Sequence, residues 1–353
     1  MPGRPRKSQI QTIQNYFNSD RRFTLEGFHG QGGQGSVYKV KFTPPGGNGL
    51  GRALVMKIAD PLRNSDVQGL TREKEILWML RNCRHIAHMH ESTTEDPLHP
   101  AAGDLGWAWI YLDRLDNGTL NNFLLRVKEA GVTRLPNRLL WVLFLCLIRG
   151  CIAMAWPSDN PEMNETTRGH PPPPPSGIAH FDLHGENVMF GHFIDHPEHS
   201  LTPILTMIDF GLALRVTSRI PPTGEQQNIE DIGILMAGII SLETNKKYSG
   251  GEIEVDLSRF GYMDLVLSPA AGILGDREVG EPDPYPYVDG DLRYIISACM
   301  ATEPTDRPSL AQLEEWATEK VYKGQPTDYL NDVAWETDQN IRTIVQNCIF
   351  NAP

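Results

Sequence analysis

Residues 180–190 read HFDLHGENVMF and gather imidazole, carboxylate and amide side chains ahead of a short apolar run. The run VMF is typical of a strand, so the polar residues would lie in the loop before it. Three interpretations fit: a metal site, an acid–base pair, or a loop that holds a phosphate donor and its Mg²⁺. The surrounding sequence decides between them.

The chain has 353 residues and is 40% apolar, which allows roughly two domains with substantial cores. Its formal charge of −12 argues against a nucleic-acid-binding protein, because such proteins usually carry a basic stripe. The one basic cluster, Arg4, Arg6 and Lys7, lies in a Pro-containing terminus. We interpret this cluster as part of a solvated tail.

The cysteine pattern and the apolar segments predict an intracellular protein, cytoplasmic or nuclear, with no membrane association. The 5 cysteines form no CxxC pair, which favours a reducing compartment. Residues 1–20 lack the apolar core of a secretory signal. The most apolar run, residues 139–148, is too short for a membrane span and predicts a buried core helix.

Hydrophobic periodicity changes from strand-like to helical along the chain. In the first third we expect one main helix over residues 66–81 and strands over 23–28, 36–42, 53–59, 86–93 and 107–112. Beyond it we expect mostly helices, over residues 138–156, 229–243, 294–304 and 310–320. The predicted class is α+β, with a small antiparallel sheet followed by a larger helical part.

Residues 157–177 contain five consecutive prolines and no core-forming pattern. We expect a solvated insertion with some polyproline II character. Recognition by an SH3- or WW-type partner is the alternative to a plain spacer.

A glycine-rich stretch, GQGGQGSV at residues 30–37, lies between two expected strands. Gly30, Gly32, Gly35 and Val37 fit the pattern GxGxxGxV, in which glycines let backbone N–H groups approach phosphate oxygens. A glycine-rich hairpin alone would look the same. A dinucleotide-binding fold is disfavoured because a strand follows the loop, where that fold has a helix.

Lys57 lies on the next expected strand among apolar neighbours, so its ammonium needs a buried partner. Glu73 on the following helix supplies one, since it shares a face with Ile76 and Leu77. Glu75 falls on a different face of that helix.

Together with HFDLHGEN at residues 180–187 and DFG at 209–211, these motifs resemble those of the eukaryotic protein kinase family, as a divergent member. The resemblance runs from about residue 23 to 320. It implies a bilobal fold, with an N-lobe over residues 23–113 and a C-lobe over 114–320 that carries the insertion. Extensions would flank it at residues 1–22 and 321–353.

The resemblance implies ATP and Mg²⁺ as cofactors and assigns a role to each motif residue. Lys57 would hold the α- and β-phosphates, oriented by Glu73. Asp209 and Asn187 would ligate Mg²⁺ through oxygen atoms. Asp182 would accept or orient the substrate hydroxyl, and the glycine-rich loop would cover the phosphates.

The same resemblance places the adenine near residues 111–118, at the junction of the lobes. Leu112 would be the gatekeeper. Asp113 and Leu115 would offer backbone groups to the base, and Asp116 would reach the ribose.

The chain departs from the family pattern in several places. Phe181 replaces the Arg that normally binds an activation-loop phosphate. His184 replaces the Lys that neutralises the transferred phosphate, which implies a weaker or pH-dependent transfer because an imidazole is only partly charged near neutral pH.

The segment that follows DFG also departs from the family. No APE-like triplet lies between Gly211 and Asp231, and Asp231 would match the buried Asp that opens the large C-lobe helix. The ion pair that such a triplet forms with Arg307 would then be missing or made elsewhere.

The implied activity is transfer of the ATP γ-phosphate to Ser/Thr hydroxyls of a protein substrate. A small-molecule acceptor stays open, since HFDLHGEN also fits the HxDxxxxN pattern of small-molecule kinases. A nucleotide-binding pseudokinase scaffold is a third interpretation. A zinc site is disfavoured because its candidate histidines fall in loop stretches: His180, His184, His192, His196 and His199.

Because Phe181 removes the phosphate receptor, we predict that activity does not depend on phosphorylation of the segment after DFG. Phosphatase treatment of the purified protein should leave its ATP turnover unchanged. The prediction fails if treatment abolishes turnover and rephosphorylation at Thr217, Ser218 or Thr223 restores it.

Overall fold

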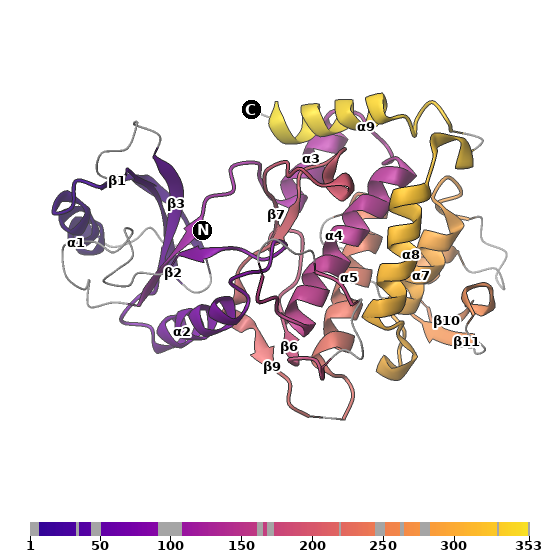
Figure 1. Cartoon of the computed structure of the whole chain (residues 1–353), viewed down its shortest axis with the longest axis horizontal. Helices are drawn as coiled ribbons and strands as arrows, with labels where there is room; N and C mark the ends of the chain where they lie inside the picture. The colour runs from indigo at the N-terminus through magenta and orange to yellow at the C-terminus, as the bar shows by residue number, and fades with distance from the viewer. Residues whose placement is uncertain are drawn as a thin grey trace. The chain divides into compact units, whose positions relative to one another are not determined.

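The computed structural model describes 11 stretches of the chain. They are residues 7–32, 35–43, 51–90, 108–160, 165–167, 173–218, 220–243, 251–261, 265–275, 283–329 and 332–351. The described chain is α+β, as predicted from the sequence, with a five-stranded antiparallel sheet and a larger set of helices. Figure 1 shows these elements in sequence colours.

The chain divides into two compact units. The N-terminal unit contains the ranges Met1–Asn82, Ile86–Arg114 and Asp209–Ala213. The C-terminal unit contains Cys83–His85, Leu115–Ile208 and Leu214–Pro353. Two short segments thus interrupt the sequence order. Cys83–His85 belongs to the C-terminal unit, and Asp209–Ala213, which contains DFG, belongs to the N-terminal unit.

The N-terminal unit is built on one sheet with the strand order β1-β2-β3-β5-β4. Its strands are β1 (Phe23–Gly32), β2 (Gly35–Phe42), β3 (Arg52–Ile58), β4 (Met89–His90) and β5 (Trp109–Asp113). All neighbouring strands are antiparallel, and Lys57 of β3 pairs with Val37 of β2 and Ile110 of β5. The expected strand over residues 86–93 is shorter than predicted, and its last three residues lie outside the described chain.

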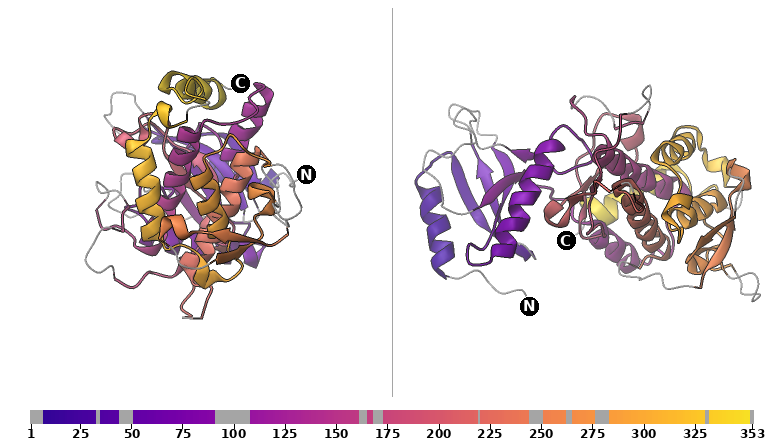
Figure 2. Two further views of the ribbon diagram at one scale, coloured as in Figure 1. Left: turned by 90° about the vertical axis from the view of Figure 1, so that its right-hand side faces the viewer. Right: turned by 90° about the horizontal axis from the view of Figure 1, so that it is seen from below.

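Two helices cover opposite faces of this sheet (Figures 1 and 2): α1 (Lys7–Asn18) and α2 (Asn64–Met79). Alternation along β3 explains the arrangement, because successive strand residues point to opposite faces. Met56 joins the core beneath α1, whereas Lys57 points to Glu73 of α2.

Helix α1 was not expected, since we interpreted residues 1–22 as an extension and the basic cluster around Lys7 as a tail. Its buried face is formed by Ile13, Tyr16 and Phe17. These residues pack into the aromatic core of the sheet, where Phe23 and Tyr111 stack with ring centroids 5.5 Å apart. The helix is therefore part of the fold of the N-terminal unit.

The C-terminal unit is mostly helical. Its helices are α3 (Leu120–Glu129), α4 (Asn137–Ala155), α5 (Gly224–Ser241), α6 (Ala271–Leu274), α7 (Gly290–Cys299), α8 (Leu310–Lys323) and α9 (Asp338–Val345). Its short strands form three pairs: β6 (Ile178–Ala179) with β9 (Leu214–Arg215), β7 (Val188–Phe190) with β8 (Leu205–Met207), and β10 (Ile253–Asp256) with β11 (Leu265–Ser268).

Helix α4 lies between α5 and α8 and is the core of this unit (Figure 1). It is the one described helix that is long and apolar enough to cross a membrane, and 94% of its apolar stretch is buried inside the protein. Such burial is typical of the core helix of a soluble protein, as the sequence predicted.

The proline-rich insertion is only partly solvated. Residues 173–175 are exposed, as expected. Glu165, in contrast, is buried and accepts hydrogen bonds from the backbone N–H groups of Arg84 and His85. Thr166 and Thr167 donate to Glu314 of α8. The expectation of a solvated segment is thus wrong around Glu165, and residues 161–164 and 168–172 lie outside the described chain.

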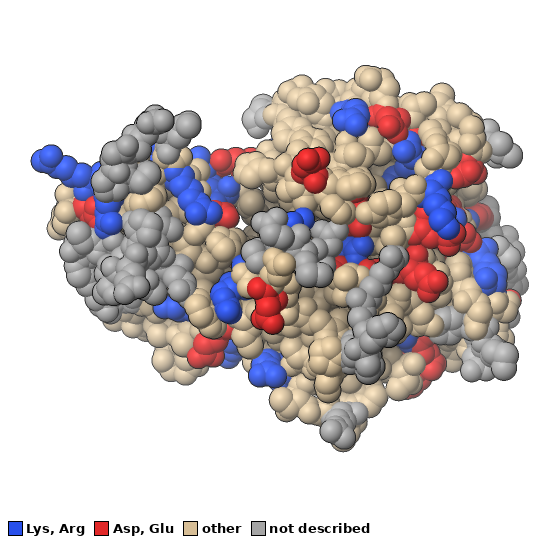
Figure 3. Space-filling view, in the orientation of Figure 1, with Lys and Arg blue, Asp and Glu red and all other residues tan. Residues whose placement is uncertain are grey.

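Charged side chains of both signs are interspersed on the face drawn in Figure 3. No basic stripe crosses the residues drawn in colour on this face.

Because α1 contributes to the core, we predict that Ile13→Ala lowers the free energy of unfolding by about 2–4 kcal/mol, through lost burial and a residual cavity. Gln14→Ala, on the exposed side of the same helix, is the matched control and should change it by less than about 0.5 kcal/mol. Urea unfolding of the full chain measures both. Equal effects would contradict a structural role for α1.

Candidate active site

The N-terminal unit holds a buried ion-pair cluster centred on Lys57. Its Nζ lies 2.6 Å from Oε2 of Glu73 and 2.7 Å from Oδ1 of Asp209. Lys57 is 6% exposed and Glu73 is fully buried, whereas Asp209 is partly exposed. Three segments far apart in sequence, β3, α2 and DFG, therefore meet at one ammonium group.

Opposing effects set the charge of Lys57. Burial lowers the pKa of its ammonium, but the Coulombic attraction of Glu73 and Asp209 and their hydrogen bonds more than offset this effect and raise it. Lys57 is therefore a fixed positive charge near neutral pH. Glu75, the rival partner considered above, is exposed on another face of α2.

The DFG segment is locked against α2 by its own backbone. Asp209 has φ 62° and ψ 68°, a left-handed conformation that Asp tolerates better than most residues. Phe210 is fully buried, and the carbonyl of Gly211 accepts a hydrogen bond of 3.1 Å from Arg72 of α2. The carboxylate of Asp209 is thus held beside Lys57 by the segment that follows it.

The glycine-rich stretch forms the hairpin between β1 and β2, in which Gly30 pairs with Val37 and Gly32 with Gly35. The tip, Gly33 and Gln34, lies outside the described residues. Gly35 has φ +137°, and a Cβ there would lie 2.1 Å from the carbonyl oxygen of Ile58 on β3. The sheet itself therefore requires Gly35.

Gly30 lies in different surroundings, since no described atom lies within 4 Å of the place where its Cβ would be. The backbone at Gly30 is consequently accessible from that side. This accessibility suits the approach of a phosphate group to backbone N–H groups.

In the C-terminal unit the structure brings together Asp182, His184 and Asn187. The side-chain amide of Asn187 donates to the carbonyl oxygen of Asp182 at 2.8 Å and to its carboxylate at 3.1 Å. Because the NH₂ group is used in this way, the amide oxygen of Asn187 is the atom left for a cation.

His184 lies beside the same carboxylate. Its Nε2 is 3.5 Å from Oδ1 of Asp182, and the two side chains are 48% and 38% exposed. Both groups are accessible to solvent, as a site for an external acceptor requires. Phe181, before Asp182, is also exposed and has φ 60°.

Positive φ is rare in residues other than glycine, and among the described non-glycine residues only Phe181, Asp209 and Leu242 adopt it. Two of the three lie in the segments that the sequence marked as catalytic. Such conformations persist where the surrounding structure enforces them and often occur at functional sites.

His180 braces the loop from its fully buried position. Its backbone N–H donates to Oδ1 of Asn228 at 3.0 Å, and its Nε2 lies 3.0 Å from the carbonyl oxygen of Ile208. Asn228, on α5, also donates to the carbonyl of Ile178 at 2.8 Å. Asn228 thus fixes both ends of the backbone before Asp182.

We expected Asp231 to open the large helix of the C-lobe, and this expectation is wrong. Helix α5 begins at Gly224, capped by Thr223, and Asp231 lies two turns further along it. Asn228 makes the backbone contacts instead. The sequence did not reveal this role of Asn228, because the resemblance assigned it to the carboxylate of Asp231, three residues later.

The ion pair of Arg307, left open by the sequence, is made within the C-terminal unit. Its Nη2 lies 3.0 Å from Oε2 of Glu230, and its Nη1 donates to the carbonyl of Gln226 at 2.8 Å. Both partners belong to α5. The segment between Gly211 and α5 is therefore not the source of this pair.

The residues expected around the adenine are divided between the units. In the N-terminal unit Leu112 is buried in β5, and the N–H of Asp113 already donates to the carbonyl of His88 at 3.1 Å. Only the carbonyl of Asp113 therefore remains for a base. In the C-terminal unit Leu115 is half-buried and Asp116 exposed.

The carboxylate of Asp113 is also engaged by neighbouring side chains. It lies 2.8 Å from Nε2 of His90 and 3.3 Å from Arg52. Burial raises its pKa, but the hydrogen bond from His90 and the positive charges of His90 and Arg52 together outweigh burial and lower it.

Comparison with models of known protein families gave no match, and comparison with curated protein sequences gave none either.

Asp231 provides a pH-dependent prediction. Burial raises the pKa of its carboxyl from 3.8 to about 6, and its Oδ2 has no hydrogen-bond partner among the described residues. Between these two values the unfolded chain loses the proton first, so folding stability falls as pH rises. We predict that Asp231→Asn stabilises the protein by about 1–2 kcal/mol at pH 8 and by almost nothing at pH 4.

Urea unfolding at the two pH values measures the effect. Asp195→Asn, which changes an exposed carboxylate of the same unit, is the control and should be neutral at both. A loss of stability at pH 8, or the same gain at both pH values, would contradict the assignment.

Proposed function

We propose that the protein is an ATP- and Mg²⁺-dependent phosphotransferase of the bilobal protein-kinase-like class, which transfers the γ-phosphate to Ser/Thr hydroxyls of a protein substrate. The observation that supports this most is the contact of Lys57 with both Glu73 and Asp209. These residues were picked out from the sequence alone, and they meet although 152 positions separate Lys57 from Asp209.

The N-terminal unit contributes the groups that bind phosphate. Lys57 holds a positive charge that Glu73 and Asp209 orient, and charge of this kind is the main requirement of phosphoryl transfer. Gly30 offers an accessible backbone. When bound, ATP supplies the phosphoryl group and Mg²⁺ neutralises its developing charge.

The available oxygen donors suit Mg²⁺, which prefers carboxylate and carbonyl oxygens. Lys57 engages one oxygen of Asp209 and leaves the other for a cation. The amide oxygen of Asn187 is oriented by the bonds of its NH₂ group to Asp182.

Asp182 is the residue that we assign to the acceptor. Its carboxylate is accessible and accepts a hydrogen bond from Asn187. It would accept the hydrogen bond of a substrate hydroxyl and orient that oxygen for attack. His184, beside it, would add partial positive charge in place of the usual Lys.

A small-molecule acceptor is the second candidate, and the segment after DFG favours testing it. Only 12 residues separate Gly211 from the first residue of α5, Gly224 (224 − 211 − 1). Arg307 pairs within α5, so this segment lacks the anchor that a protein-substrate platform normally has. We also propose a cytoplasmic or nuclear location, and an SH3- or WW-type partner for the exposed prolines at 173–175.

Labelled ATP with Mg²⁺, offered to the full chain with peptide arrays or with metabolite pools, tests the activity and identifies the acceptor. Asp182→Asn and Asp209→Asn should each reduce transfer by about 100-fold or more. Glu73→Gln should reduce it as well. Its matched control is Glu75→Gln, which changes an exposed residue of the same helix and should retain full transfer.

Turnover that is equal in the wild type, Asp182→Asn and Asp209→Asn would contradict a phosphotransferase. Binding of ATP without turnover would then favour the scaffold interpretation. Transfer to a metabolite but to no peptide would replace the protein acceptor by a small molecule and keep the chemistry.

A further inference from the structure

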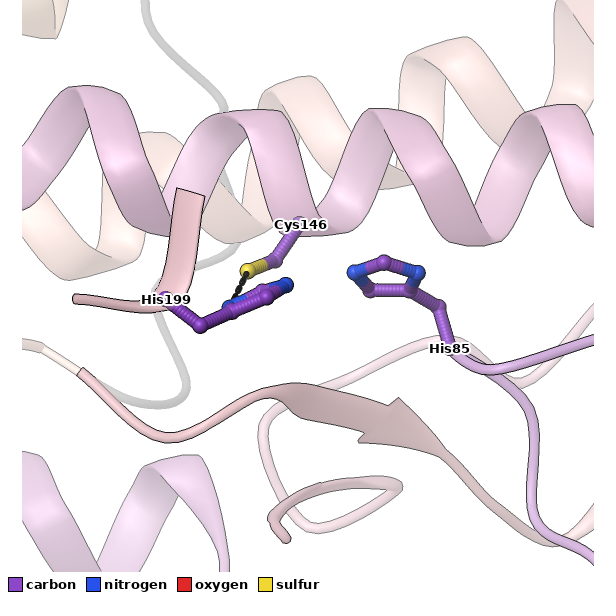
Figure 4. Close-up of side chains that lie close together, drawn as sticks. All are labelled: His85, Cys146 and His199. Atoms are coloured by element: carbon purple, nitrogen blue, oxygen red, sulfur yellow. Dashed lines mark hydrogen bonds between the residues drawn. The ribbon is translucent and has the colours of Figure 1, made fainter. Parts of the chain in front are cut away.

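Three side chains that play no part in the proposed transfer meet inside the C-terminal unit: His85, Cys146 and His199. Figure 4 shows that they point toward one another. His85 lies in the turn after α2, Cys146 on α4, and His199 at the end of a 3₁₀ turn, Pro197–His199. They are 1%, 3% and 2% exposed, respectively.

One ligand atom from each side chain lies within 4.8 Å of the other two. The Sγ of Cys146 is 3.9 Å from Nδ1 of His199. In a zinc site, bonds of about 2.0–2.3 Å to nitrogen and sulfur place the ligand atoms about 3.4–3.8 Å apart. Shifts of about half an ångström per side chain therefore suffice to close the group around an ion.

Placing His199 in an exposed loop, as we did from the sequence, is wrong. The preceding residue, Glu198, forms a buried ion pair with Arg149 of α4, 2.8 Å apart. This pair draws the 3₁₀ turn against the helix and turns His199 inward. His180 and His184 take no part in the cluster.

The groups that contact His85 resemble those around the histidine of a metal site. Nδ1 of His85 lies 2.9 Å from the buried carboxylate of Glu165. Its other ring nitrogen, Nε2, is buried and has no hydrogen-bond partner among the described residues. A carboxylate on one imidazole nitrogen commonly orients the other toward a metal. An unpaired buried nitrogen is otherwise unfavourable.

The donor set narrows the choice of ion. Mg²⁺ and Ca²⁺ prefer oxygen ligands, so two imidazoles and a thiolate disfavour them. Zn²⁺ accepts both donor types.

We propose that Cys146, His85 and His199 bind a structural Zn²⁺ ion through Sγ, Nε2 and Nδ1, with Glu165 as a positioning residue. Binding replaces the thiol proton of Cys146, which is released to solvent. These side chains supply three of the four ligands of a tetrahedral Zn²⁺ ion. The ion links the turn after α2, the core helix α4 and the loop before β8.

Zinc content tests the proposal independently of phosphotransfer. Full-length protein without an affinity tag, purified without chelators, should contain about one zinc per chain by mass spectrometry. The zinc content of Cys146→Ala should be lower by about tenfold or more. Cys151→Ala is the matched control, because Cys151 is a fully buried cysteine of the same helix that contacts the carbonyl of Asn228.

Glu165→Gln separates positioning from ligation. It should keep the site but weaken zinc affinity by about 10- to 100-fold in a chelator competition. In the wild type, replacing zinc by Co²⁺ should produce a thiolate-to-cobalt charge-transfer band in the near ultraviolet. This measurement decides the question even if Cys146→Ala does not fold.

Three outcomes would overturn the proposal. The first is wild-type protein that contains no zinc and takes up none, without the cobalt band. The second is Cys146→Ala that retains as much zinc as Cys151→Ala. The third is copper in place of zinc. None of them bears on transfer from ATP, so the two proposals fail separately.

Discussion

The ion pair between Lys57 and Glu73, extended to Asp209, is the interaction on which the rest of the site depends. Removing Lys57 from water is unfavourable unless its charge is compensated, and the two carboxylates together raise the pKa of its ammonium in spite of its burial. Each carboxylate requires its own support. Helix α2 carries Glu73, and the left-handed turn at Asp209 is held by the buried ring of Phe210 and by Arg72. The need to compensate the charge on Nζ of Lys57 thus constrains a strand, a helix and a distant loop.

In the C-terminal unit, neutral amide side chains hold the loop of Asp182 in place. The loop of Asp182 is fixed through backbone contacts by Asn228 and through Asn187, whose amide is committed to Asp182 itself. An amide can donate and accept at once, so Asn228 satisfies a buried N–H and a buried carbonyl together. A carboxylate at that position would only accept. The exposed side chains of the loop are consequently free to serve an acceptor while the backbone beneath them stays fixed.

The sequence predicted the parts of this structure that depend on local pattern. Alternation and helical periodicity predicted the strands around Lys57 and the face of α2 that carries Glu73, because both follow from which side chains must be buried. Contacts determined by tertiary packing were missed. Asn228 was overlooked in favour of Asp231, since the two residues lie about one helical turn apart and periodicity alone does not choose between them. Helix α1 has few apolar residues, and only the aromatic core of the sheet reveals why Ile13 is buried.

Glu165 changes how the proline-rich insertion should be regarded. A tether of this length that touches nothing would be one long loop, whose closure entropy is spread over the whole segment. Contacts at Glu165 and the two threonines after it divide the segment into two shorter stretches of chain on either side of a fixed point. By this argument extra residues in either stretch would affect stability little, whereas removal of the anchor would restore one long closure. Stability therefore depends more on the position of this one carboxylate than on the length of the chain on either side of it.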